Sequence, residues 1–377
     1  MDLEKTTKSA YPRNPVITLP AYRNKNGFLY RYLHRYGNII LMMDMNACEW
    51  QTAALLIFYD IQKSAMVTPP DWTAYEKSCR VFDVCPIQSC VFSLALLGEK
   101  CILSCFEMKC HTWQQCEIPV EWSRNRFSSP RIRMEYDGAT LYVGILDTKT
   151  EFWSYFKVIR TKGELHPEPL SFLRGDFTLF HPIRSSQDEM VFRVSGNSLE
   201  IQNAQENTFQ KVHAHDAIIR YCHNGFDIIA SDSEQFSLEY DAVIGKYIYY
   251  EIVEESKSVL MRYDLVSHDN CVVSDAQERF VALSSEKDLY TYDRMTFQRM
   301  SDGKLFSVDA VMQAFQELQV PFLDEIEPFP AMCFFHDHWL EIEVSDFRFL
   351  FIHLDTMSPY YLEGVADAVG NVIYHYE

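Results

Sequence analysis

Two histidine pairs have a spacing at which they could bind a metal ion. His213 and His215 stand two residues apart, as do His336 and His338, and His353 follows later in the chain. Residues two apart on a β-strand share a face, so each pair would present two imidazoles to one metal, with His353 as a third ligand from a neighbouring strand. Both pairs also fall at expected strand ends or hairpin turns, where polar residues are common. We therefore assign no metal site to them.

The cysteines form the second candidate group. The chain has 11 cysteines, and seven of them lie between residues 79 and 116. Their spacing includes no C-x-x-C pair and matches no zinc template. Cys101 and Cys105 have the same parity and would face one side of a strand as small buried hydrophobic residues. Cys110 and His111, at a turn, are the pair in this region that merits a metal-binding test.

Motifs for nucleophilic catalysis and phosphate binding are absent from the sequence. It contains no G-x-S-x-G elbow and no glycine-rich phosphate loop. Paired carboxylates of a glycosidase are the remaining catalytic possibility. The acids noted here mostly belong to repeated hairpins, however, and Glu251–Glu255 is interpreted as a solvated strand end. We assign no catalytic, cofactor-binding or metal-binding residue and expect no cofactor.

The elements that would position these residues are hairpins of one repeated design. In Ser104–Pro119, an alternating strand ends at Glu107, a polar turn follows, and a second strand begins near Trp113, six residues after the acid. An acid or amide at the strand end accepts hydrogen bonds from turn amides, and the aromatic packs between layers. Eight pairs follow this plan: Asp60 and Met66, Glu107 and Trp113, Asp147 and Trp153, Asn203 and Phe209, Asp241 and Tyr247, Asp264 and Asn270, Asp293 and Arg299, and Asp355 and Tyr361.

The intervals between these pairs predict an all-β propeller. A four-stranded blade needs about 40 to 50 residues, so the short step from Asp241 to Asp264 places both in one unit. Seven blades result, with six as the alternative, and their stacking would protect the sheet edges. Val16–Pro20 or Asn371–Tyr376 would complete a blade started at the other end of the chain. A first hairpin is expected from Phe28–His34 and Asn38–Asp44.

One short helix is expected within this pattern, near residues 307–319. Ser307 is a suitable N-cap, and apolar residues recur on one face at helical spacing. This face comprises Val308, Val311, Met312, Phe315 and Leu318. We expect the helix to pack on the propeller. A lid or docking element is the alternative.

Two stretches resemble the third and fourth strands of blades in kelch-type propellers and in F-box-associated domains. The first combines Leu55–Asp60 with Val67–Pro70, and the second combines Leu103–Glu107 with Trp113–Pro119. The resemblance covers residues 16–377 diffusely. It implies a protein-recognition ring whose partners bind on a face built from inter-strand loops.

Composition and charge limit the classes of partner. The net charge is −19, and no basic stripe offsets it locally, so nucleic acid would be repelled. The charge serves solubility first, and it would also suit a basic surface on a partner protein. No run approaches the about 18 apolar residues of a membrane span, and we expect no membrane contact.

The cysteines and the N-terminus indicate the compartment. The N-terminus shows no apolar secretory region, and an odd number of cysteines fits free thiols in the cytosol or nucleus. Residues 1–15 are predicted to be a mobile tail and residues 16–377 a single propeller domain. The sequence thus predicts a non-enzymatic intracellular scaffold or adaptor that binds another protein through propeller-face loops. A propeller-type glycoside hydrolase with carboxylates at the central mouth is the alternative.

Overall fold

The structure is a computed structural model, and it describes most of the chain. The described residues are 15–24, 26–44, 56–78, 80–97, 100–120, 132–146, 153–161, 163–186, 188–203, 208–222, 224–255, 257–274, 280–283, 288–292, 295–318, 333–336, 338–345 and 348–377. The chain divides into two compact units, one of Tyr22–Leu238 and one of Met1–Ala21 with Glu239–Glu377. Most of the predicted N-terminal tail, together with Cys79, Asp147 and Asp293, lies outside the described residues.

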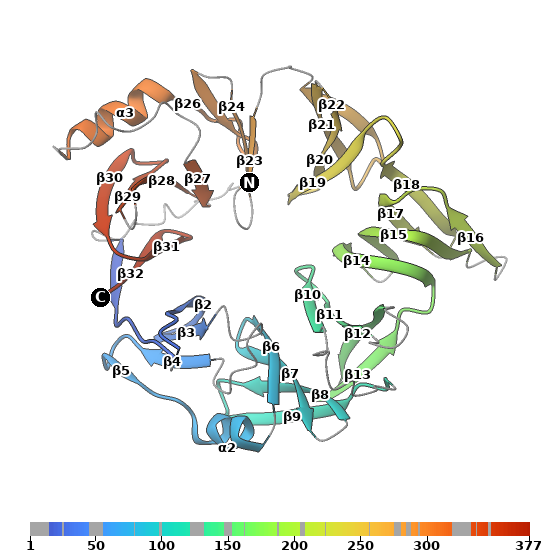
Figure 1. The fold of residues 1–377 in the computed structure, drawn as a ribbon, viewed down its shortest axis with the longest axis horizontal. Coiled ribbons are helices and arrows are strands. Elements are labelled where there is room, and N and C mark those ends of the chain that lie inside the picture. Colours follow the sequence, from blue (N-terminus) through green and yellow to red (C-terminus); the bar gives the residue numbers. More distant parts are fainter. Residues whose placement is uncertain are drawn as a thin grey trace, which may run out of the picture. The chain divides into compact units, whose positions relative to one another are not determined.

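The unit Tyr22–Leu238 contains four antiparallel sheets that follow one another along the chain (Figure 1). Their strands are β2 (Tyr30–Tyr36), β3 (Ile39–Asp44), β4 (Leu56–Asp60) and β5 (Ala65–Met66); β6 (Arg80–Ile87), β7 (Cys90–Leu97), β8 (Lys100–Glu107) and β9 (Thr112–Glu117); β10 (Ile132–Tyr136), β11 (Leu141–Leu146), β12 (Trp153–Thr161) and β13 (Glu164–Pro169); and β14 (Leu173–Ser185), β15 (Glu189–Asn203), β16 (Thr208–Val212), β17 (Asp216–Cys222) and β18 (Gly225–Ser231). In the first three sheets each strand pairs with the next, whereas the fourth is branched at β15.

The second unit also contains four sheets among its described residues. Their strands are β19 (Ser237–Ile244), β20 (Tyr247–Glu254), β21 (Lys257–Asp264) and β22 (Asn270–Ser274); β23 (Phe280–Leu283), β24 (Leu289–Tyr292), β25 (Thr296–Arg299) and β26 (Leu305–Ser307); β27 (Cys333–His336), β28 (Trp339–Ser345), β29 (Arg348–His353) and β30 (Ser358–Glu363); and β1 (Val16–Leu19), β31 (Ala366–Val369) and β32 (Val372–Tyr376). Consecutive four-stranded sheets with this up-and-down order are the blades of a β-propeller.

The predicted blade number is wrong, because the described residues form eight blades rather than seven or six. Seven sheets each span a position marked by the acid pattern, and Asp241 and Asp264 share one sheet, as predicted. The eighth sheet, β1-β32-β31, contains no marked hairpin. A count of hairpins therefore misses it, since it is assembled from strands at opposite ends of the sequence.

This eighth sheet joins both chain ends. β1 pairs in parallel with β32, with Val16 opposite Ile373 and Leu19 opposite Tyr376. The pairing continues beyond the strands, because the Ala21 amide donates to the Glu377 carbonyl and the Glu377 amide to the Leu19 carbonyl, both at 2.9 Å. The prediction that a terminal segment completes a blade begun at the other end is thus confirmed, and both candidate segments take part.

The core lies between neighbouring sheets within each unit. Apolar residues on successive strands, such as Leu41, Phe58, Val91 and Phe106, form one buried cluster between two adjacent sheets. Strands with a period of two bury one set of side chains against each neighbouring sheet, so the inner strands of a blade are apolar on both faces. The Tyr- and Phe-rich composition supplies the large side chains that fill this space.

The hairpin turns have a common geometry in both units. Ser64, His111, His268 and Met357 have φ between 51° and 63°, and each lies near the end of the turn between the third and fourth strands of its blade. In the turns of His111, His268 and Met357, the amide of this residue donates to the carbonyl four residues earlier. The turns thus reverse the chain with little glycine.

Strand-end acids cap two of these turns as predicted. Asp60 Oδ1 accepts hydrogen bonds from the amides of Gln62 and Lys63, and Asp264 Oδ1 does the same for Val266 and Ser267. The hydrogen bond from the Lys246 side chain, followed by these amide bonds, lowers the pKa of Asp264 to about 2.

The described residues include two helices. α3 (Val308–Gln316) confirms the predicted helix, and its N-cap Ser307 accepts a hydrogen bond from the Ala310 amide. α3 packs on β26, β29 and β30, with Val311 and Phe315 fully buried. Among the described residues, neither helix has the length and apolar character that crossing a membrane requires.

The sequence interpretation missed the other helix, α2 (Pro70–Ser78), which follows β5. Trp72 of this helix is fully buried and stacks on Trp113 at 5.7 Å between ring centroids. Proline at the first helical position followed by an acid is a helix-start signal.

Candidate functional site

The branched sheet departs most clearly from the blade plan. β15 is 15 residues long and changes partner along its length: Glu189–Ser195 pairs with β17, whereas Leu199–Asn203 pairs with β16. β14 pairs with both halves of β15. The outer halves of β14 and β15 together with β16 therefore form a three-stranded extension of the blade, and β16 contributes a strand edge (Figure 1).

A cavity of about 510 Å³ lies where the chain passes from β16 to β17. The chain here runs along one edge of β15, and the Gly196 amide donates to the His215 carbonyl at 2.8 Å. Asp232, which follows β18, accepts hydrogen bonds from the amides of His215 and Asp216, each at 2.9 Å. The cavity is lined by Gly196, Asn197, Lys211, Val212, His213, Ala214, His215, Asp232, Ser233 and Glu234. We call it the branch-point pocket.

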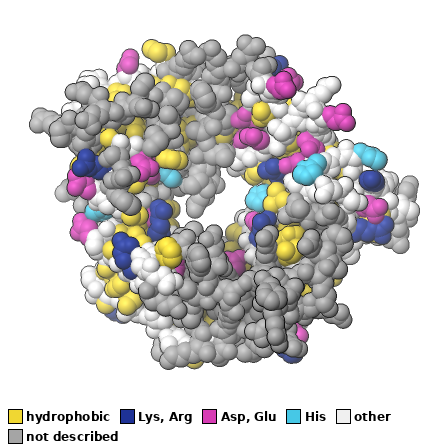
Figure 2. Space-filling view, in the orientation of Figure 1, with side chains coloured by type: hydrophobic (Ala, Val, Ile, Leu, Met, Phe, Trp, Pro, Cys, Tyr) yellow, Lys and Arg dark blue, Asp and Glu magenta, His cyan; other side chains and the backbone are white. Residues whose placement is uncertain are grey.

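Four charged or titratable side chains of the branch-point pocket form no side-chain hydrogen bond or ion pair with the described residues. These are Lys211, His213, His215 and Glu234, all of them exposed. Exposed histidines, drawn in cyan, stand beside acidic and basic side chains on the face shown in Figure 2. The side chains of the pocket can donate and accept hydrogen bonds, and they can bind either a positive or a negative group of a ligand.

The first histidine pair lies in this pocket, with neighbours that the sequence did not indicate. Among the described residues, no group of three His, Cys, Asp or Glu side chains is arranged to hold a metal ion. The sequence interpretation missed Asp232 and Glu234. A run of acidic and small polar residues directly after a strand does indicate a turn, and the side chains of such a turn can line a pocket.

Internal contacts hold the branch point in place. Arg193 of β15 donates two hydrogen bonds from Nε to Asp216, at 3.0 and 3.1 Å, so that Asp216, next to His215, is paired with a cation. Gly175 of β14 has φ +114°, and a Cβ there would lie 1.7 Å from the Ser198 carbonyl oxygen. The extension therefore requires a glycine where β14 approaches β15 this closely.

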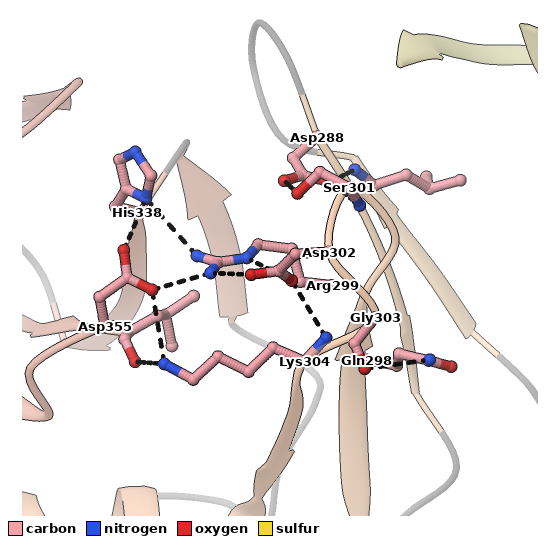
Figure 3. A network of polar contacts seen from close by, with 11 residues as sticks. Asp288, Gln298, Arg299, Ser301, Asp302, Gly303, Lys304, His338 and Asp355 are labelled. Carbon is pink, nitrogen blue, oxygen red and sulfur yellow. Dashed lines mark hydrogen bonds and ion pairs between the residues drawn. The ribbon is translucent and has the colours of Figure 1, made fainter. Parts of the chain in front are cut away.

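A second polar cluster lies between the sheets β23–β26 and β27–β30 (Figure 3). Arg299, whose side chain is 6% exposed, donates to Asp302 at 2.6 Å and to Asp355 at 2.8 Å. Lys304 and His338 reach the same Asp355 carboxylate, at 3.4 and 3.0 Å. We call these five residues the Arg299 cluster.

Charges within the Arg299 cluster compensate one another. Burial would raise the pKa of Asp355, but the hydrogen bond and charge of Arg299, with His338 and Lys304, lower that pKa to about 2. The hydrogen bond to Asp302 raises the pKa of Arg299. Because each buried charge has a partner, the cluster acts as a tie between two blades rather than as a reactive group.

The second histidine pair is divided between different contacts. His336 Nε2 lies 2.9 Å from Glu341, whereas His338 contacts Asp355. His338 does approach His353, with ring centroids 5.9 Å apart and nearly parallel, and burial lowers the pKa of His353. His336 and His338 therefore point to separate carboxylates, and the pair does not act as a chelating unit.

The cysteines of the cluster are mostly packed in sheets. Cys90, Cys101 and Cys105 are buried, and Cys101 and Cys105 share one apolar cluster, as their parity predicted. Cys110 is exposed and lies 3.0 Å from the Thr112 hydroxyl, while His111 occupies the left-handed turn position. The residue pair suggested for a metal test is thus part of a hairpin turn.

Carboxyl groups also gather on neighbouring strands of one blade. Burial, followed by the charges of Glu251 and Glu239, raises the pKa of Asp241 to about 8. Its Oδ2 atom is buried without a hydrogen-bond partner among the described residues. Burial also raises the pKa of Glu251, which accepts a hydrogen bond from the Ser258 hydroxyl. Asp241 lies within β19, not at the strand end predicted for it.

Comparisons with known proteins give structural likeness at low sequence identity. No protein-family model and no curated protein matches this sequence. The chain is similar to an oligogalacturonate lyase solved in complex with manganese, with 12% identity over 91% of this chain and 95% of that one and a TM-score of 0.43.

Two propellers of other kinds are also similar. The β-propeller domain of the trilobed protease from Pyrococcus furiosus shows 12% identity over 74% of this chain and 86% of that chain, with a TM-score of 0.38. The Dos1 propeller shows 10% identity over 89% and 86% of the two chains, with a TM-score of 0.38. The comparisons assign no activity to this chain, and its resemblance to kelch-type and F-box-associated propellers stays a prediction.

Proposed function

We propose that this chain is a protein-binding scaffold or adaptor whose branch-point pocket receives a polar segment of a partner protein. The observation that carries the proposal is the set of uncommitted side chains Lys211, His213, His215 and Glu234 around one cavity. Elsewhere, the Arg299 cluster and the turn-capping acids satisfy one another within the fold. Side chains that form no hydrogen bond or ion pair within the fold remain available to bind a partner.

A segment of protein fits this pocket better than an apolar small molecule. Small-molecule sites are mostly lined by hydrophobic side chains, with a few polar groups that set orientation. The lining of the branch-point pocket includes the cationic Lys211, the acidic Asp232 and Glu234 and two histidines. A peptide brings amides, carbonyls and charged side chains that match such a lining. The net charge of −19 favours a partner with a basic surface.

Catalysis at this pocket has weaker support. A glycosidase needs two carboxylates that face one substrate, one as acid and one as base or nucleophile. Of the two acids here, Asp232 is already occupied by the amides of His215 and Asp216. Glu234 remains as a single carboxylate, which suits binding. For the scaffold we propose a cytosolic or nuclear location, supported by the cysteine content and composition of the chain.

Affinity purification with mass spectrometry, using pocket variants, tests the scaffold proposal. The tagged chain should co-purify with a partner protein in stoichiometric amount, and the double variant His213→Ala/His215→Ala should no longer co-purify with that partner. His166→Ala removes a partly exposed histidine of β13 outside the pocket and should keep it. A chain that captures no stoichiometric protein, or one whose capture is equal in all three forms, would overturn the proposal.

Asp241 favours a second candidate, a glycoside hydrolase. A carboxylic acid with a pKa of about 8 beside Glu251 and Glu239 has the protonation expected of a general acid next to a second carboxyl group. A panel of chromogenic glycosides would test it. Activity that Asp241→Asn abolishes while the folded state persists would support this candidate, and no hydrolysis across the panel would count against it.

A further inference from the structure

One thiol lies between a cation and a carboxylate. Cys90 begins β7, and its Sγ is 3.1 Å from Nη1 of Arg160 and 3.1 Å from Oε2 of Glu107, to which it donates. Arg160 also reaches Glu107 at 3.8 Å and donates from Nε to Gln114 at 3.1 Å. The guanidinium is thus held in place above the sulfur by two neighbours besides the thiol itself.

A second thiol lies beside the first. Phe92 is opposite Cys105 and Cys90 is opposite Glu107 in the β7–β8 pairing, so Cys90 and Cys105 are diagonal neighbours on one face of the sheet. Both side chains are buried in the same apolar cluster. Both cysteines are free, which leaves a dithiol at this position.

The environment makes the two thiols unequal. The hydrogen bond from Cys105 and the charge of Arg160 lower the pKa of Cys90, against its burial and the nearby Glu107. The same hydrogen bond and burial raise the pKa of Cys105. Thiolates react with oxidants and thiols do not, so Cys90 is the nucleophile of the pair and Cys105 its protonated neighbour.

Access to Cys90 is limited to small reagents. The cysteine is 6% exposed, whereas the Arg160 and Glu107 side chains above it are 37% and 17% exposed. The sulfur is thus close to solvent through the two charged side chains that contact it. A bulky alkylating agent is disfavoured at the same site.

The other described cysteines of this region lack this combination. Cys110 is exposed but has a threonine hydroxyl as its contact. Burial raises the pKa of Cys101 to about 12 and of Cys116 to about 11. Cys110 is therefore an internal control for the effect of exposure on oxidation, and Cys101 and Cys116 are controls for the effect of burial.

We propose that Cys90 is a peroxide-reactive thiol and that Cys105 resolves its oxidised form as a disulfide between β7 and β8. In the first step the Cys90 proton passes to Glu107, and the thiolate attacks one oxygen of hydrogen peroxide. The S–O bond forms as the O–O bond breaks, and the leaving hydroxide takes the proton to become water. Sulfur is oxidised to a sulfenic acid, and the peroxide is reduced.

In the second step Cys105 attacks the Cys90 sulfur. The S–S bond forms, the S–O bond breaks, and the departing hydroxide leaves as water with the Cys105 proton. The product ties the second and third strands of one blade together. This site is separate from the branch-point pocket and does not depend on the function proposed for it.

Mass spectrometry of the full chain treated with hydrogen peroxide tests the proposal. We expect one peptide pair cross-linked through Cys90 and Cys105, reversible by dithiothreitol, and formed about tenfold faster than oxidation of Cys110. Oxidation of Cys110 ahead of Cys90 would overturn the proposal. So would a Cys90 that remains reduced while the exposed cysteines are oxidised.

Two variants separate the steps. In Cys105→Ser the disulfide cannot form, so dimedone should trap the sulfenic acid at Cys90. In Arg160→Gln the cation is lost and the rate at Cys90 should fall about tenfold, with Arg160→Lys restoring part of it. Circular dichroism establishes that each variant is folded. Unchanged kinetics in folded Arg160→Gln, or no dimedone adduct in folded Cys105→Ser, would refute the mechanism.

Discussion

Arg299 illustrates how a single residue can join two blades. It ends β25, and its guanidinium reaches Asp355 in the turn after β29, 56 residues later in the chain. The side chain is almost completely buried, so its charge is stabilised by Asp302 and Asp355 instead of by water. The stability of this part of the protein therefore depends on keeping the ion pairs complete.

Removal of the buried cation should be strongly destabilising. In Arg299→Met, Asp302 loses its cation and Asp355 keeps only Lys304 and His338. We expect the free energy of unfolding to fall by about 3 kcal/mol, because a broken buried pair leaves a charge poorly compensated. Lys304→Met removes a 39% exposed cation from the same carboxylate and should cost less than about 1 kcal/mol. Urea unfolding followed by tryptophan fluorescence measures both. Equal losses would contradict the role assigned to Arg299.

Asp241 should make stability fall as the pH rises. Its folded pKa of about 8 lies above the ordinary value of 3.8, so the folded state holds a proton that the unfolded state releases. The stabilisation is complete below the ordinary pKa and is lost as the pH approaches 8. Asp241→Asn cannot ionise, so its stability relative to the wild type should increase across this range. Parallel stability curves for the two proteins, from thermal unfolding in matched buffers, would contradict the assignment.

At the scale of elements, β15 determines where the candidate site forms. Its length allows it to pair first with β17 and then with β16, and the chain between these two strands carries His213 and His215 into the branch-point pocket. β14 and β15 approach each other closely at Gly175, which lies opposite Leu199 in the extension. The site is therefore a property of strand pairing as much as of side chains.

Gly175→Ala should disrupt the extension. The new methyl group would meet the Ser198 carbonyl, and φ +114° is unfavourable for alanine, so we expect a loss of more than about 1 kcal/mol. Gly225→Ala has a comparable φ of +131° with open space around the added carbon, and serves as the matched control. Hydrogen exchange should show lost protection in β16 for Gly175→Ala. A smaller effect than that of Gly225→Ala would contradict the steric argument.

At the scale of the whole molecule, β1 provides the link between the chain ends. Its four residues pair with β32, and Leu19 is fully buried. Without β1, the three-stranded sheet would consist of a two-stranded hairpin, which has little stability alone. The first strand of the sequence is thus needed to complete the last blade.

Deletion of residues 1–20 should lower the thermal midpoint and expose β32. The lost strand removes its ladder and buried Leu19, and protection against hydrogen exchange at Val372–Tyr376 should disappear. Deletion of residues 1–14 keeps β1 and is the matched control. If both deletions leave exchange at β32 unchanged, the parallel pairing of the chain ends is not what stabilises this sheet.

The sequence alone determined the features that depend on neighbouring residues. Alternation of apolar and polar positions predicted strands, strand-end acids such as Asp60 predicted turns, and Ser307 with its apolar face predicted α3. The pattern also identified His213 and His215 as residues of interest. These predictions succeed because side-chain periodicity and turn hydrogen bonds act over a few residues.

Tertiary structure alone decided the features that join distant residues. The eighth blade pairs β1 with β32, the branch-point pocket brings Asp232 to His215, and the Arg299 cluster brings β25 to the turn after β29. A periodic pattern reports which face of a strand is buried, not which strand will lie beside it. Partner choice depends on packing across the whole chain. For that reason the fold class followed from the sequence, while the blade number and the site did not.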